Sequence, residues 1–121
     1  MTEARNSKQY DLEDRTLAFA RAVREFVKSL KPTTANIEDG KQLVRASGSV
    51  GANYIEGNES LGKKDFLMRI RICKKESKES RYWLRLVDAC GEQKLEIRRQ
   101  ELVQEATELM NIFGSILRKS E

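Results

Sequence analysis

Histidine is absent from this 121-residue chain, and cysteine, proline and aromatic residues are few. Without histidine there is no Ser-His-Asp triad, no Glu-x-x-His di-iron pattern and no ordinary Cys/His zinc site. We therefore expect no metal, no cofactor and no catalytic residue. Glu56, Glu76 and Glu79 are the carboxylates to watch in an enzyme, but no nucleophile or phosphate-binding loop accompanies them. The sequence favours a protein that is not an enzyme.

Long apolar runs are also missing. No stretch of about twenty apolar residues and no basic, apolar leader is present, which predicts no membrane span and a cytoplasmic protein. The two cysteines, Cys73 and Cys90, fall on one predicted helix about 25 Å apart, too far for an intrachain disulfide. Both fall on its predicted buried face, so we expect them to be small, reduced, buried side chains.

What the chain does have is helical periodicity. The length suits a single domain spanning residues 1–121, and 35% charged residues with one proline favour long, surface-charged helices. Apolar residues spaced by three and four predict helices over about 11–30, 37–59, 63–90 and 95–118. Short links make neighbouring helices antiparallel. The predicted fold is all-α, an antiparallel up-down-up-down four-helix bundle.

Local signals set the expected helix ends. Asp11 is a predicted N-cap, and Pro32 should stop the first helix because it disfavours helical geometry in the residue before it. Asn36 is a plausible N-cap of the second helix, and Gly91 a plausible terminator of the third. Residues 1–9 are polar and lack periodicity, so we expect a frayed end.

The second predicted helix contains four glycines, each costing up to about 1 kcal/mol relative to alanine. The spacing from Gly48 to Gly51 is the GxxG of KH-type nucleic-acid clamps, and a glycine-rich turn before a helix can bind phosphate. However, no strand precedes these glycines and no Gly-Lys-Ser/Thr follows them. We therefore expect the small residues here to allow close approach of another helix.

The third predicted helix carries the excess positive charge. Residues 63–85 include nine Lys or Arg and three acids, a local charge of +6. Placed at 100° per residue, six of its cations form one stripe that also contains a tyrosine. We call this stripe the basic ridge and define it as Lys64, Arg71, Lys74, Lys75, Lys78, Tyr82 and Arg85.

The basic ridge favours contact with RNA, or DNA, because Lys and Arg bind phosphates with little sequence selection and an exposed tyrosine can stack on a base. A solvated helix face is the plainer interpretation of the same charges. Glu76 falls within the apolar arc opposite and should be paired or hydrogen-bonded.

A second hypothesis is a protein-interaction or scaffold module without a nucleic-acid ligand. The ridge would then face an acidic partner or a neighbouring subunit. The second predicted helix has a polar edge formed by Ser49, Asn53 and Glu56. This edge is either exposed to water or an interface to another subunit. With Glu76, these residues would be structural or interface polar groups that fix the register between helices.

Two segments of the chain, QLVRASGSVGANYIEG and KKDFLMRIRICKKESKESRYWLRL, together resemble a bacterial protein family encoded in intervening sequences of 23S ribosomal RNA. The family pattern is QLxRAxxSxxxNxxEG, then a helix opened by K-D-F, then E-x-x-E-x-x-Y/W. The matching positions are Gln42, Leu43, Arg45, Ala46, Ser49, Asn53, Glu56, Gly57, Lys64, Asp65, Phe66, Glu76 and Glu79, with Trp83 as the aromatic, one residue beyond the spacing of the pattern. Val50 and Gly51 depart from the Ile-Pro or similar pair that the family usually has between the serine and the asparagine.

The resemblance spans about half the chain and implies a four-helix bundle without established chemistry. It also implies a homo-oligomer, a ring-shaped homopentamer, because the family is similar in this respect to accessory proteins of diversity-generating retroelements. Those relatives have basic surfaces and are linked to nucleic acid. By analogy, the basic ridge here is expected to contact RNA.

Overall fold

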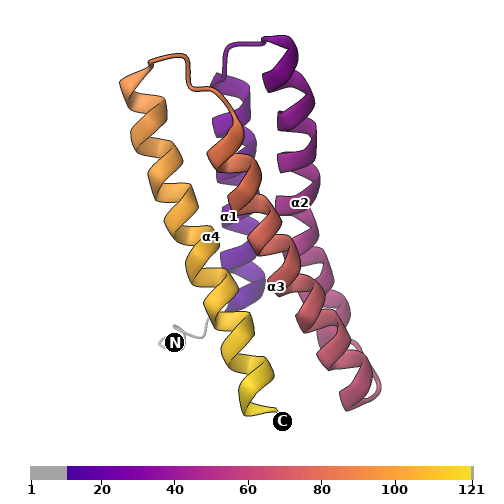
Figure 1. The fold of residues 1–121 in the computed structure, drawn as a ribbon. Helices are drawn as coiled ribbons and strands as arrows, with labels where there is room; N and C mark the ends of the chain where they lie inside the picture. The colour runs from indigo at the N-terminus through magenta and orange to yellow at the C-terminus, as the bar shows by residue number, and fades with distance from the viewer. Residues whose placement is uncertain (1–10, 121) are drawn as a thin grey trace, which may run out of the picture.

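The computed structural model describes residues 11–120, which form four helices: α1 (Leu12–Ser29), α2 (Thr34–Asn58), α3 (Lys63–Leu86) and α4 (Gln93–Lys119). Each helix packs on the next, and α4 packs back on α1, so α1 and α3 occupy one diagonal of the bundle. Figure 1 shows the helices running alternately up and down. The all-α, up-down-up-down four-helix bundle is confirmed. The expectation for residues 1–9 lies outside the described residues.

The core runs along the bundle axis and receives side chains from all four helices. Phe19, Val23 and Phe26 come from α1, as their 4-3 spacing requires. The remaining buried members of the core include Leu43, Val50, Ile70, Leu84, Leu102, Leu109 and Phe113. None of the four helices has an apolar stretch of the length that a bilayer requires.

The α1–α2 contact depends on small residues of α2. A Cβ at Gly51 would lie 2.7 Å from Thr16 Oγ1, and one at Gly40 would lie 3.1 Å from Val27 Cγ1. α1 therefore lies closer to α2 than larger residues would permit, which confirms the expected close helix approach.

The start of α2 differs from the prediction. Thr33 is the N-cap, and its side chain accepts a hydrogen bond from the Asn36 backbone N–H. Asn36 is instead a buried residue within the helix, where its Nδ2 donates to the carbonyl oxygens of Lys31 and Asp88. The cap prediction was wrong because both Thr33 and Asn36 are capping residues by type. The hydrogen bond from Asn36 to Asp88, 52 residues away in the sequence, holds Asn36 inside the helix and leaves Thr33 as the cap.

The end of α3 also differs, because the helix stops at Leu86 and not near Cys90. Arg99 of α4 donates from Nη1 to the carbonyl oxygens of Leu84 and Val87, at 2.8 and 2.6 Å. These bonds satisfy carbonyls that the next turn would have used. Cys90 and Gly91 adopt left-handed backbone with φ of 55° and 77°. The prediction that Cys90 is buried is therefore wrong, whereas Cys73 is buried as expected.

Candidate nucleic-acid interface

The basic ridge lies on the face of α3 that points away from the bundle. All seven of its residues are exposed, including Tyr82 with 57% of its surface accessible. Lys64 and Arg85 are 21 residues apart, so the ridge extends about 30 Å along the helix. It is therefore a long, narrow, cationic surface.

No ridge cation forms an ion pair with an acid among the described residues. Within residues 11–120, the ion pairs use other basic residues, such as Arg15 with Glu105 and Arg99 with Glu96. Several further pairs join residues on the same helix face. The charge of Lys75 acts on the nearby carboxylate of Glu79, but no ridge cation is held in an ion pair in this part of the chain.

The face of α3 beside the ridge carries polar residues that join it to α2. Arg45 of α2 forms ion pairs with both Glu76 and Glu79 of α3. Trp83 Nε1 donates to Glu79 Oε2 at 3.1 Å. The hydrogen bond from Trp83 and then the pairing with Arg45 hold the pKa of Glu79 below its usual value. These side chains fasten one helix to the other.

Glu76 is 8% exposed and has a partner of the expected charge. Arg45 Nη1 lies 3.5 Å from Glu76 Oε1, which is an ion-pair distance. Among the described residues, however, no group donates a hydrogen bond to this buried oxygen. Arg45 therefore offsets the charge of Glu76 without fully replacing the hydration that the carboxylate loses on burial.

The other predicted structural polar residues divide into two groups. Asn53 Nδ2 donates to the backbone oxygen and Oγ of Ser49, both at 2.9 Å, and its Oδ1 accepts from Arg69 Nη1 at 2.8 Å. Ser49 and Asn53 are thus half-buried members of the α2–α3 contact. Glu56 is exposed on α2, and its backbone oxygen is the acceptor for Ser60 Oγ.

Two basic residues near the ridge were not selected from the sequence. Arg81 Nη1 lies 3.3 Å from Thr107 Oγ1 of α4 and donates to it. Arg118 of α4 reaches back over Gly114, where Lys74 of the ridge also lies. A helical-wheel projection of α3 alone cannot show which residues of α4 lie beside the basic ridge.

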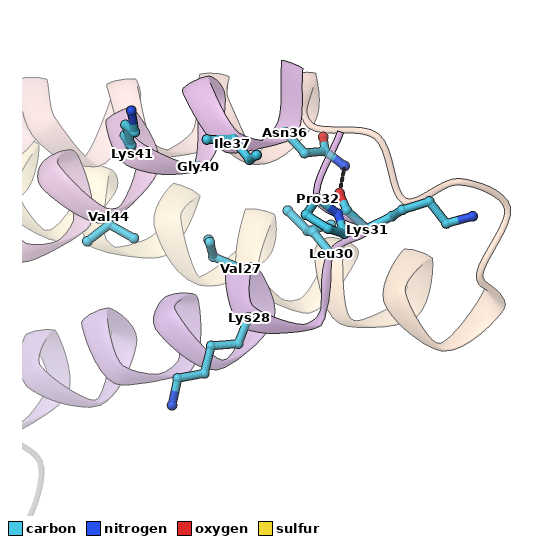
Figure 2. A pocket seen from close by; sticks show the side chains of 10 residues that line it. All are labelled: Val27, Lys28, Leu30, Lys31, Pro32, Asn36, Ile37, Gly40, Lys41 and Val44. Carbon is cyan, nitrogen blue, oxygen red and sulfur yellow. Dashed lines mark hydrogen bonds between the residues drawn. The ribbon is translucent and has the colours of Figure 1, made fainter. Parts of the chain in front are cut away.

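The α1–α2 face contains a groove that sequence reasoning also missed. Three adjoining hollows, the largest two of about 580 and 550 Å³, run between these helices. Figure 2 shows one end, where Val27 and Val44 lie toward the space between the helices and the ammonium groups of Lys28, Lys31 and Lys41 point away. Leu17 and Ile55 line the other end and are about half exposed.

The groove has a basic rim around an apolar floor. Its charged lining residues are five cations and two acids: Arg21, Arg24, Lys28, Lys31, Lys41, Glu13 and Glu25. Between residues 11 and 120, no group of three or more acidic or cysteine side chains is placed to hold a metal ion. The basic ridge and this groove are the two candidate ligand surfaces that we consider.

Comparisons with known proteins place this arrangement in a family. A family model described as "23S rRNA-intervening sequence protein" matches residues 8–115. The chain is also similar to the crystal structure of a protein of unknown function from the S23 ribosomal protein family of Bacteroides thetaiotaomicron VPI-5482. That similarity has a TM-score of 0.75 and 26% identity, and covers 87% of this chain and 96% of the other. No curated protein matches. Because the family model covers most of its length, this chain belongs to the 23S rRNA-intervening sequence protein family.

Proposed function

We propose that this protein is a non-enzymatic, oligomeric module that acts in the cytoplasm and binds structured RNA through the basic ridge. One observation carries the proposal: the seven ridge residues are all exposed, and no acid among residues 11–120 forms an ion pair with the six cations. A phosphate backbone supplies the counter-charge that is missing. The family description refers to 23S rRNA, which makes structured RNA the first ligand to test and DNA the second.

The physical character of such binding follows from the side chains. Lys and Arg would contact phosphates and provide affinity without reading the sequence, while Tyr82 could stack on an unpaired base. Each phosphate contact releases counterions, so the logarithm of the association constant should fall by about 0.7–0.9 per contact for each decade of salt. Binding should therefore be strong at low salt and insensitive to base changes.

The test is fluorescence anisotropy with a labelled 23S rRNA hairpin at about 50 and 200 mM salt, the range over which phosphate contacts lose most affinity. The variant is Lys74→Glu with Lys75→Glu and Lys78→Glu. A matched control reverses Lys28, Lys31 and Lys41, which changes the net charge equally on the α1–α2 face. We expect the ridge variant alone to lose binding. Sedimentation of both variants checks that the oligomer is kept, because the control residues line the α1–α2 groove. Absence of binding at low salt, or equal losses in two variants that keep the parent's oligomeric state, contradicts the proposal.

A second candidate function, a protein-interaction module, is favoured by the α1–α2 groove. We propose that its occupant is a second copy of this chain, in keeping with the oligomer that the family resemblance implies. Leu17 and Ile55 expose 49% and 46% of their surface beside the small residues Gly48, Gly51 and Ala52. Burying such side chains provides most of the free energy of a subunit contact.

Sedimentation velocity tests this assembly, with and without RNA. We expect the unaltered protein to be an oligomer and the double variant Leu17→Glu with Ile55→Glu to be a monomer. Leu61→Glu is the control, since Leu61 is fully exposed and lies off the groove. A monomeric parent protein, or an oligomer that survives both glutamates, counts against the groove as the subunit contact. An RNA-indifferent oligomer that binds no RNA favours the interaction module over RNA binding.

A further inference from the structure

Lys74 of α3 and Arg118 of α4 converge over Gly114. Lys74 Nζ lies 3.8 Å, and Arg118 Nη1 3.4 Å, from the point that a Cβ of residue 114 would occupy. Gly114 itself is buried, but both cationic side chains are exposed. Two positive groups from different helices therefore lie within 4 Å of one point, and that point is free of any side chain of residue 114.

The same helix–helix seam holds a further cation. Arg81 and Lys74 are seven residues apart on α3, and Thr107 and Gly114 are seven apart on α4. Because Arg81 Nη1 donates to Thr107 Oγ1, the pair Arg81–Thr107 lies two turns from Lys74–Gly114, or about 10 Å along the antiparallel helices. Basic groups thus recur along the seam at helical spacing.

Acids are missing from this side of α4. Residues 109–119 contain no acid, and the acids that precede them, Glu105 and Glu108, form ion pairs with α1. Arg15 binds Glu105 at 2.8 Å through Nε and Glu108 at 2.8 Å through Nη2. Within residues 11–120, neither Lys74 nor Arg118 forms an ion pair. Their mutual repulsion is therefore not relieved by a carboxylate of the described chain.

We infer that Gly114, Lys74 and Arg118 form a binding site for one phosphate group, which we call the Gly114 site. The ligand class is the phosphodiester backbone of structured RNA, so the inference rests on the proposed function. It extends the RNA-contact surface from α3 onto the C-terminal half of α4. A phosphate oxygen packs against the bare Cα of Gly114, farther out than the point that a Cβ would occupy, and it accepts hydrogen bonds from Arg118 and Lys74. Arg81 adds positive charge two turns away.

The charge of the Gly114 site and the space at its glycine can be changed independently, so two kinds of variant test the site. Arg118→Gln removes one donor and one charge, and Lys119→Gln is its control because Lys119 is the exposed neighbour on the same last turn. Gly114→Ala leaves the net charge unchanged and adds a methyl group that keeps a phosphate oxygen from approaching the backbone between the two cations. Its contacts at 3.4 and 3.8 Å are ordinary, so the helix should fold, with thermal melts as the check.

Binding of the labelled rRNA hairpin is measured for each protein at several salt concentrations. Arg118→Gln should weaken binding about tenfold, the loss of one charged hydrogen bond, and reduce the salt slope by about one contact. Gly114→Ala should weaken binding by a similar factor, whereas Lys119→Gln should bind nearly as the parent does. If Arg118→Gln and Gly114→Ala both bind like Lys119→Gln while the ridge variant fails, the Gly114 site is overturned and RNA binding stands. If the parent protein binds no RNA, both proposals fail together.

Discussion

Asn36 and Asp88 hydrogen-bond each other twice across 52 residues of chain. Asn36 Nδ2 donates to the Asp88 carbonyl oxygen at 2.8 Å, and the Asp88 backbone N–H donates to Asn36 Oδ1 at 2.9 Å. The side-chain amide thus donates one hydrogen bond to the Asp88 backbone and accepts one from it, as the backbone of a neighbouring β-strand would. It fixes the α3–α4 connection to the first turn of α2.

Asn36→Ala should destabilise the bundle. The change removes hydrogen bonds to Lys31 and Asp88 and leaves partly buried backbone groups without these partners, at a cost of about 1–3 kcal/mol. Urea unfolding followed by circular dichroism measures the free energy of unfolding. Asn111→Ala, at an exposed position of α4, is the control and should change it by less than about 0.5 kcal/mol. Equal effects at the two positions would show that the Asn36 bonds contribute little.

Arg99→Met tests the other contact that ends α3. Arg99 is 8% exposed, and its guanidinium satisfies carbonyl oxygens of Leu84, Arg85 and Val87. Methionine keeps the packing but leaves these acceptors unbonded, so we expect a loss of about 2–3 kcal/mol in unfolding free energy. The adjacent Arg98→Met breaks an exposed ion pair with Glu101 and should cost no more than about 0.5 kcal/mol. A small loss for both variants would contradict this role.

Two glycines of α2 should respond oppositely to alanine. At Gly51 the new Cβ would lie 2.7 Å from Thr16 Oγ1, and Thr16 cannot move freely because it donates to the Leu12 carbonyl. At Gly48 the nearest atom is the far end of the flexible Arg24 side chain, at 3.2 Å. Thermal melts should show Gly51→Ala destabilised and Gly48→Ala unchanged or stabilised by up to about 1 kcal/mol. The reverse order would refute the close approach of α1 at Gly51.

Acid should weaken the Arg45–Glu79 connection. The pKa of Glu79 is lowered in the folded protein by the hydrogen bond from Trp83 and by Arg45. A lowered folded pKa means that this contribution to stability is present above the ordinary value of 4.5 and is lost as pH falls through the lower, folded value. Urea midpoints of the parent and Glu79→Gln should therefore differ at pH 7 and converge as the pH falls below 4.5 and through the lower, folded value. A difference that is constant with pH would exclude this linkage.

The two cysteines should react very differently with iodoacetamide. Burial raises the pKa of the Cys73 thiol to about 12, and its Sγ donates to the Val50 carbonyl oxygen at 3.3 Å. Cys90 is exposed in the α3–α4 connection. Mass spectrometry should find a single label on native protein, at Cys90, and a second only in denaturant. Cys90→Ser should abolish native labelling; rapid modification of Cys73 in that variant would show that the core opens readily.

The parts of the fold that local patterns determine were predictable. Apolar residues at spacings of three and four placed the four helices, and Asp11 and Pro32 marked the ends of α1 within a residue or two. The basic ridge was visible because its residues share one face of one helix. Each of these features depends on residues close together in the sequence.

The parts that were missed depend on residues far apart. The end of α3 is set by the hydrogen bonds of Asn36 with Asp88 and of Arg99 with Leu84. No sequence pattern indicates these partners. The same holds for the Gly114 site, where Lys74 and Arg118 meet only because α3 and α4 are antiparallel in one register. The α1–α2 groove was missed because it is a property of the space between two helices.

α3 packs on α2 through one face and exposes another face to solvent. The residues of the family pattern, Arg45 with Glu76, Glu79 and Trp83, fasten it to α2, whereas the basic ridge faces solvent. Tyr82 adjoins Trp83 and Lys75 acts on Glu79, but Lys64, Arg71, Lys74, Lys78 and Arg85 form no ion pair with the pattern residues, so substitution at these five positions should leave the contact with α2 in place. Relatives that share the pattern are therefore free to differ in what they recognise, and the outward residues of α3 are the ones to compare when ligands are assigned across the family.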